Sequence, residues 1–278
     1  MRRNRGAILK RLLTTAVLLP LLLALILVPK LEPCFMLFCA LLAAVGLREY
    51  FSLARRKGIN VEGAFGIVAG TLVVLSANWG RLELTAMVFF VGTALMAWAH
   101  ILAGAWSLTG VAASVFGVFY VGWLSAHFVL LRQMPGIGPG LVIMLCVAVM
   151  ASDAGAYFVG KSFGKHKLAA RVSPNKTWEG AVGGVVAAVL GAVVLYLLRS
   201  SLHWGIYPDW GLPAYMGVCV ALAVTEQIGD LLESMLKRDA GVKDSGGLFP
   251  GHGGVLDRCD GFLFAAPVLY YLAALVEV

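Results

Sequence analysis

Long apolar runs separated by short polar segments dominate this chain. A membrane-spanning helix needs roughly 20 apolar residues, because the hydrocarbon core is about 30 Å thick and a helix rises about 1.5 Å per residue. Breaks at Pro, Gly and charged residues divide the runs into nine predicted helices, at residues 12–29, 34–51, 62–78, 82–102, 108–130, 139–159, 179–198, 211–232 and 260–277. The third is short and Gly-rich, which suits close helix packing. We therefore expect an all-α, polytopic transmembrane bundle of about nine spans.

Composition supports this interpretation. Hydrophobic residues make up 60% of the 278 residues and charged residues 13%, whereas about a quarter of an ordinary soluble chain is charged. The whole chain, residues 1–278, is therefore predicted to form one membrane domain. The basic residues before position 12 resemble the start of a secretory signal, but the following apolar run is long and further spans come directly after it. We interpret this segment as a retained anchor.

The basic residues indicate an orientation. If the N-terminus is cytoplasmic, 18 of the 22 Lys and Arg residues fall on the cytoplasmic side, in residues 2–11, 48–57, 161–176 and 237–258. This bias predicts that the N-terminus is inside and the C-terminus outside. The net charge of +7 then reflects topology and attraction to anionic lipid, and we expect no nucleic-acid partner. The five scattered cysteines form no C-x-x-C pair, so we expect apolar fillers and neither a zinc site nor a disulfide framework.

Acidic residues inside apolar runs are the first candidates for chemistry. Asp153 lies one to two turns from the predicted cytoplasmic boundary, where a carboxylate is costly and indicates function, or else a hydrogen bond between packed helices. In the eighth predicted helix, polar residues recur at spacings of three and four, which places them on one face. They are Glu226, Asp230, Glu233, Ser234 and Lys237. Such a stripe lines a cavity or pairs with a neighbouring helix.

A polar loop follows this helix and leads to Asp257 and Asp260. Its glycines let the backbone approach a ligand and present N–H groups to phosphate oxygens, while Lys and Arg neutralise charge. Asp257 and Asp260, three apart, are expected on one face of a helix start. Paired carboxylates suit Mg²⁺, which prefers oxygen ligands and shares substrate phosphates. The loop therefore predicts a metal-assisted phosphate site.

The second half of the chain resembles the phosphatidate cytidylyltransferases, also called CDP-diacylglycerol synthases. The matching positions of the signature are Ser234, Lys237, Arg238, Lys243, Asp244, Gly246, Phe249, Pro250, His252, Gly253, Gly254, Asp257, Arg258 and Asp260. Residues 173–180 resemble a second family motif, and Asp153 lies where the family has an acidic residue. The resemblance covers residues 152–260, and Cys259 stands at a position that is usually apolar.

The resemblance implies an enzyme that joins CTP and phosphatidic acid into CDP-diacylglycerol and pyrophosphate, with Mg²⁺ and room for a second cation. It implies an active site on the cytoplasmic face of the cell's inner membrane, residues 139–278 as the catalytic part, and residues 1–138 as a scaffold that could also supply homodimer contacts. The implied metal ligands are Asp230, Asp257 and Asp260, with Asp153 as a further candidate. The implied phosphate-binding or catalytic cations are Lys176, Lys237, Arg238, Lys243 and Arg258. Further substrate-binding candidates are Ser173, Asn175, Thr177, Ser234 and His252, whose imidazole could instead hold the loop.

Two other functions compete with this one. A transporter or channel would use Asp153, Glu226 and Asp230 as an ion pathway, but the acidic residues accompany a long basic loop, and broken helices in two repeats are absent from the sequence. A CDP-alcohol phosphotransferase would carry an Asp-Gly-x2-Ala-Arg pattern, which this sequence lacks.

Overall fold

The computed structural model describes residues 19–104, 107–202, 205–247 and 253–276. Among these residues, seven helical segments are long and apolar enough to cross a membrane, and a shorter apolar segment spans Gly63–Trp79. The predicted all-α membrane bundle is therefore confirmed. Of the first predicted helix, at residues 12–29, the structure describes residues 19–29. Residues 19–27 are helical.

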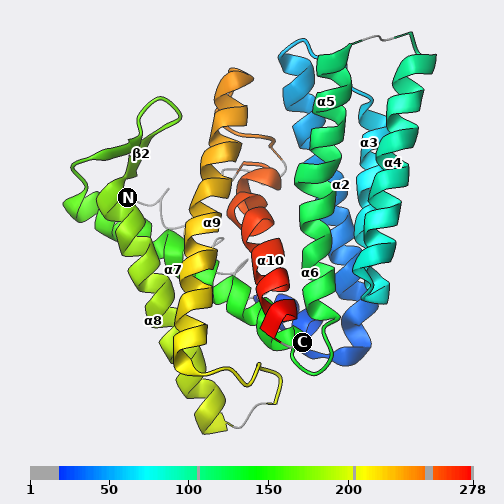
Figure 1. Ribbon diagram of the computed structural model, residues 1–278. Coiled ribbons are helices and arrows are strands. Elements are labelled where there is room, and N and C mark those ends of the chain that lie inside the picture. Colours follow the sequence, from blue (N-terminus) through cyan, green and yellow to red (C-terminus); the bar gives the residue numbers. More distant parts are fainter. Residues whose placement is uncertain (1–18, 105–106, 203–204, 248–252, 277–278) are drawn as a thin grey trace, which may run out of the picture.

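The first group of helices forms one side of the bundle (Figure 1). A short 3-10 turn, η1 (Pro29–Leu31), precedes α2 (Glu32–Arg56); α3 (Gly63–Ser76), η2 (Ala77–Trp79) and α4 (Leu82–Leu102) follow. The predicted helix at 108–130 is divided into α5 (Leu108–Gly117), a π-helical turn η3 (Val118–Trp123) and α6 (Leu124–Arg132). A Cβ on Gly122 would lie 2.7 Å from the Gly70 Cα, so small residues let η3 and α3 pack backbone to backbone.

The second group carries the polar segments. It comprises α7 (Gly138–Phe163), strands β1 (Lys167–Ala169) and β2 (Ser173–Thr177), α8 (Trp178–Leu202), α9 (Leu212–Asp239) and α10 (Leu256–Val276). The strands form an antiparallel hairpin that pairs Lys167 with Thr177. α7 packs along α8, α9 packs against both α8 and α10, and α10 also contacts α6. In Figure 1, α9 and α10 therefore lie between α8 and the first group.

The polar ends of these helices extend beyond the predicted apolar runs. α9 continues to Asp239 and α7 to Phe163, because a helix satisfies its own backbone and basic residues such as Lys237 stabilise its C-terminal end. The β-hairpin was not predicted, since its short strands alternate too few residues to give a period-two pattern.

Three basic segments meet at one end of the bundle. The Lys57 Nζ, just after α2, lies 2.6 Å from the Asp239 Oδ1 at the end of α9. Arg238 Nε donates to the Val172 carbonyl in the hairpin turn at 3.3 Å. These contacts join the segments at residues 48–57, 161–176 and 237–258, which confirms that the three share a face of the molecule. The fourth basic segment lies outside the described residues.

Candidate active site

A polar cavity of about 500 Å³ opens between α7, the hairpin, α8 and α9. The hairpin covers one side of it, and the antiparallel register brings Asn175, Lys176 and Thr177 of β2 to the cavity wall. These three predicted substrate-binding residues therefore lie together. Ser173 begins β2 opposite Ala169 and is not among the residues that line the cavity.

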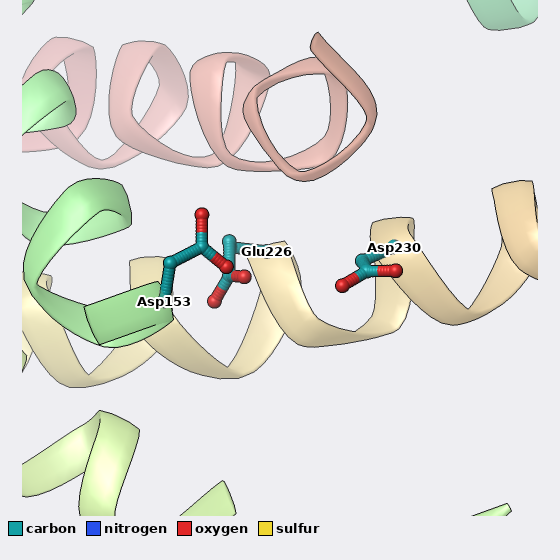
Figure 2. A group of neighbouring side chains, drawn as sticks. All are labelled: Asp153, Glu226 and Asp230. Atoms are coloured by element: carbon teal, nitrogen blue, oxygen red, sulfur yellow. The ribbon is translucent and has the colours of Figure 1, made fainter. Parts of the chain in front are cut away.

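Three carboxylates in the wall of this cavity lie close together. Asp153 comes from α7, and Glu226 and Asp230 come from successive turns of α9 (Figure 2). One carboxylate oxygen from each lies within 4.8 Å of the other two. The structure thus joins the predicted ligands Asp153 and Asp230, and adds Glu226, which the sequence placed on the polar stripe but not among the metal ligands.

The surroundings of these acids suit a hard cation. Glu226 is only 2% exposed and accepts a 2.7 Å hydrogen bond from the Ser152 hydroxyl. Lys176 forms an ion pair with Asp230, and Arg258 lies close enough to Asp153 to attract it. Three carboxylates this close repel one another when all are ionised, and a bound cation would relieve that repulsion. Because all the donors are carboxylate oxygens, the set fits Mg²⁺.

Two lysines that were counted only as topology signals also line the polar cavity. They are Lys161, on the last turns of α7, and Lys167, on β1. The Lys161 Nζ lies 5.6 Å from the centre of the Tyr157 ring, a cation–π distance. Together with Lys176, they give the cavity three ammonium groups near the acidic cluster. The sequence did not predict that these lysines share a cavity, because the hairpin is what brings residues 167 and 176 together.

The Glu179 carboxylate fastens the hairpin to the first turn of α8. Its oxygens accept hydrogen bonds from the backbone N–H groups of Lys165 and His166, and it lies 2.6 Å from the His166 Nδ1. At the same turn, the Thr177 hydroxyl accepts a 3.1 Å hydrogen bond from the Gly180 N–H. A carboxylate near a helix N-terminus is electrostatically favoured, so this contact fixes the cavity wall.

A buried ionic network lies one to two turns further along the same face of α9. Lys237 forms ion pairs with Glu233, one turn before it, and with Asp257 on α10, whose Oδ1 lies 2.6 Å from the Lys237 Nζ. The Asp257 Oδ2 accepts hydrogen bonds from the backbone N–H groups of Ser245 at 2.9 Å and Gly254 at 2.7 Å. The side chains of Lys237, Glu233 and Asp257 are 12%, 0% and 7% exposed. Asp257 therefore has a full set of partners away from the three-carboxylate cluster.

Asp260 lies nearer that cluster, because α9 and α10 approach closely at two glycines. A Cβ on Gly229 would lie 2.7 Å from the Asp260 carbonyl oxygen, and one on Gly261 would lie 2.6 Å from the Glu226 Cγ. The Asp260 carboxylate consequently interacts electrostatically with Asp230. Asp257 and Asp260 are three residues apart in the first two turns of α10, but their partners differ. Asp257 pairs with Lys237, whereas Asp260 interacts with Asp230.

The remaining predicted residues are spread around this centre. The Ser234 hydroxyl lies 3.4 Å from the Asp230 Oδ1. Arg238 bonds to backbone carbonyls of the hairpin turn and of Val242, and Lys243 is exposed in the loop after α9. His252 lies outside the described residues.

A second, apolar cavity of about 210 Å³ lies on the opposite side of α10. Helices α2, α6, α7 and α10 contribute to its wall, which includes Cys39, Cys146 and Cys259. Cys39 and Cys219 are buried among apolar side chains, as expected of apolar fillers, whereas Cys34 is exposed. Arg258 also lines this cavity. Its guanidinium also lies within electrostatic range of Asp153.

Comparisons with known proteins show the family of this chain. Residues 9–276 match the model of the Cytidylyltransferase family. A phosphatidate cytidylyltransferase of Bacillus subtilis is 33% identical over 271 residues, covering 96% of this chain and 97% of the relative. Relatives of the same name from Brucella suis and Synechocystis are 36% and 34% identical, covering 87% and 85% of this chain and 84% and 87% of their own lengths.

Proposed function

Because this chain belongs to the cytidylyltransferase family and transfers CMP from CTP to phosphatidate, we propose that its two cavities divide the substrates. The polar cavity binds CTP, and the apolar cavity receives an acyl chain of phosphatidate. The observation that carries this proposal is the clustering of Asp153, Glu226 and Asp230 in a cavity that three lysines also line. Reactants with many negative charges need such a combination of cation ligands and ammonium groups.

The three carboxylates are the proposed Mg²⁺ ligands, and Asp260 is the nearest further acid. When bound, Mg²⁺ would neutralise phosphate charge and polarise the phosphoryl group that is transferred. Asp257 remains a proposed ligand only through the family resemblance, since its carboxylate contacts Lys237, the Ser245 hydroxyl and the loop backbone. A second cation stays a prediction of that resemblance.

The chain's own contribution is alignment and neutralisation. A phosphate oxygen of phosphatidate attacks the α-phosphorus of CTP, a new P–O bond forms, and the bond to the leaving pyrophosphate breaks with its electron pair. The nucleophile is already anionic, so a strong general base is not required. Lys161, Lys167 and Lys176 are proposed to bind the CTP phosphates and to stabilise the charge that develops on pyrophosphate.

Arg258 is proposed to bind the phosphatidate headgroup. It lines the apolar cavity and lies in electrostatic range of Asp153, so a phosphate held by it would stand between lipid and nucleotide. A cavity of about 210 Å³ accommodates roughly seven to eight methylene groups, and each buried methylene contributes about 0.8 kcal/mol. This arrangement gives the lipid an apolar site next to the reacting phosphate.

The orientation is also a proposal. We propose nine crossings of the cell's inner membrane, with the N-terminus and the three joined basic segments in the cytoplasm, where CTP is available. The excess of Lys and Arg in these segments supports that orientation. A homodimer formed through residues 1–138 stays a prediction. A cysteine substituted for Lys165 should react with an impermeant thiol reagent only from the cytoplasmic side, and labelling only from the other side would contradict the orientation.

The central test is an assay of purified protein in detergent micelles, with CTP, phosphatidate and Mg²⁺. We expect CDP-diacylglycerol and pyrophosphate to form only with a divalent cation, and Asp230→Asn to lower turnover by roughly 100-fold or more. Asp239→Asn is the matched control, because Asp239 stands on the same helix but is exposed beside Lys57. Normal turnover of Asp230→Asn would contradict the assignment of the metal site.

A further inference from the structure

Glu49, on α2, carries a buried carboxylate that reaches the start of α10. It is 8% exposed. Its Oε1 accepts a hydrogen bond from the Val255 N–H at 3.1 Å, and its Oε2 accepts one from the Leu256 N–H at 2.9 Å. The Ser245 hydroxyl lies 3.0 Å from the same Oε2. Glu49 therefore contacts both sides of the loop that separates α9 from α10.

These contacts cap a helix from outside its own sequence. The first N–H groups of a helix have no intrahelical acceptor, and a negative charge near them is favoured by the helix dipole. Here the acceptors for Val255 and Leu256 come from Glu49, more than 200 positions earlier. The carboxylate thereby fixes the first turn of α10, which carries Arg258 and leads to Asp260.

Ser245 joins this cap to the ionic network on α9. Its hydroxyl lies 3.0 Å from both the Glu49 Oε2 and the Asp257 Oδ2, so it can donate to one of them at a time. Asp257 in turn contacts Lys237. A continuous chain of polar contacts therefore runs from α2 through the loop to α9.

Two glycines of the loop leave room for the Glu49 carboxylate. The three atoms nearest to a Cβ on Gly246 all belong to Glu49, and those nearest to a Cβ on Gly254 are the two Glu49 oxygens and the Ser245 hydroxyl. Neither glycine is among those with positive φ. The space around the carboxylate, and not a special backbone conformation, accounts for Gly at these two positions.

We propose that Glu49 is a positioning residue for the reaction. By holding the first turn of α10, it sets Arg258 and Asp260 relative to the acids of α7 and α9, without itself contacting substrate. This inference rests on the proposed roles of Arg258 and Asp260. It assigns a function to the N-terminal half of the chain, in which sequence motifs indicated only membrane spans.

The first test is Glu49→Gln, measured as kcat and KM on protein that elutes as a single species and melts above the assay temperature. Outer-shell partners of a metal site typically contribute 10–100-fold, so kcat should fall by about that factor. KM for CTP should change less than about three-fold, because the polar cavity is built from α7, the hairpin, α8 and α9. A kcat within about two-fold of the wild type, or a change confined to KM for CTP, would overturn the proposal.

A second test applies even where Glu49→Gln does not fold. Gly246→Ala pushes a methyl group against Glu49, and Glu49→Asp withdraws the carboxylate by one methylene. We expect Gly246→Ala to lower kcat, and the double variant to lose less than the product of the two single losses. Gly217→Ala is the control, since its added Cβ meets nothing within 4 Å. Multiplicative losses would overturn the proposal.

Asp230→Asn, assayed beside these variants, separates the two hypotheses. If it abolishes turnover while Glu49→Gln does not lower kcat, the positioning role is wrong and the metal site stands. If Asp230→Asn is fully active, the assignment of the site is wrong, and the positioning role falls with it.

Discussion

Replacing Lys237 by Met should destabilise the protein, because it removes a cation from a buried network. Lys237 contacts both Glu233 and Asp257, and the three side chains are 12%, 0% and 7% exposed. The substitution leaves a fully buried Glu233 without its ion-pair partner. Loss of one member of a buried pair typically costs 3–5 kcal/mol, so the midpoint of thermal unfolding should fall by roughly 5–15 °C.

The measurement is thermal unfolding in detergent micelles, followed by circular dichroism, with turnover measured on the same samples. Lys57→Met is the matched control. Its partner is Asp239, the two side chains are 47% and 61% exposed, and such surface pairs contribute at most about 1 kcal/mol. Its midpoint should therefore shift by less than about 3 °C.

A double variant tests the charge argument directly. Lys237→Met combined with Glu233→Gln removes the buried charge together with its partner, while Asp257 keeps the backbone N–H groups of Ser245 and Gly254. It should recover more than half of the lost stability, since neutral replacement of a buried pair is often nearly neutral. If Lys237→Met melts like the wild type and loses only turnover, the reasoning is wrong, and Lys237 serves the substrate instead of the fold.

Three further substitutions probe the cavities. Glu179→Gln weakens the charged contacts that hold the hairpin, so KM for CTP should rise roughly ten-fold with little change in kcat; an unchanged KM would contradict this role. Cys146→Phe should fill the apolar cavity and lower kcat/KM for long-chain phosphatidate roughly ten-fold more than for a dihexanoyl analogue, whereas equal losses would exclude chain binding there. Gly261→Ala presses on the Glu226 side chain, so the Mg²⁺ concentration for half-maximal turnover should rise about ten-fold, while an unaltered Mg²⁺ titration would argue against Glu226 as a ligand.

Hydrophobic pattern predicted the helices well, because spanning a membrane imposes length and composition on each segment. Their polar ends were harder to predict. α7 and α9 continue past their apolar runs to Phe163 and Asp239, since helical hydrogen bonding does not stop where apolar side chains do. The β-hairpin depends on tertiary contacts with Glu179, which no local pattern displays.

The site was predictable where one helix carries it. Periodicity along α9 placed Glu226 and Asp230 on one face, and both line the polar cavity. The partner of Asp257 was not predictable, because the direction of a side chain in the first turn of a helix depends on how that turn is capped. Glu49 gave no signal in the sequence, because it stands beside Arg48 at the start of a basic segment and its partner Ser245 lies 196 positions away.

The cap from α2 bears on how this protein is built during synthesis. α2 is synthesised long before α10. The hydrogen bonds from the Val255 and Leu256 N–H groups to the Glu49 carboxylate can therefore form only after the last helix is made. A fragment beginning at residue 139 would contain every acid of the polar cavity, yet lack the acceptor that orders the start of α10. The boundary near residue 138 thus divides two stretches of sequence, whereas the hydrogen bonds between Glu49 and the start of α10 cross it.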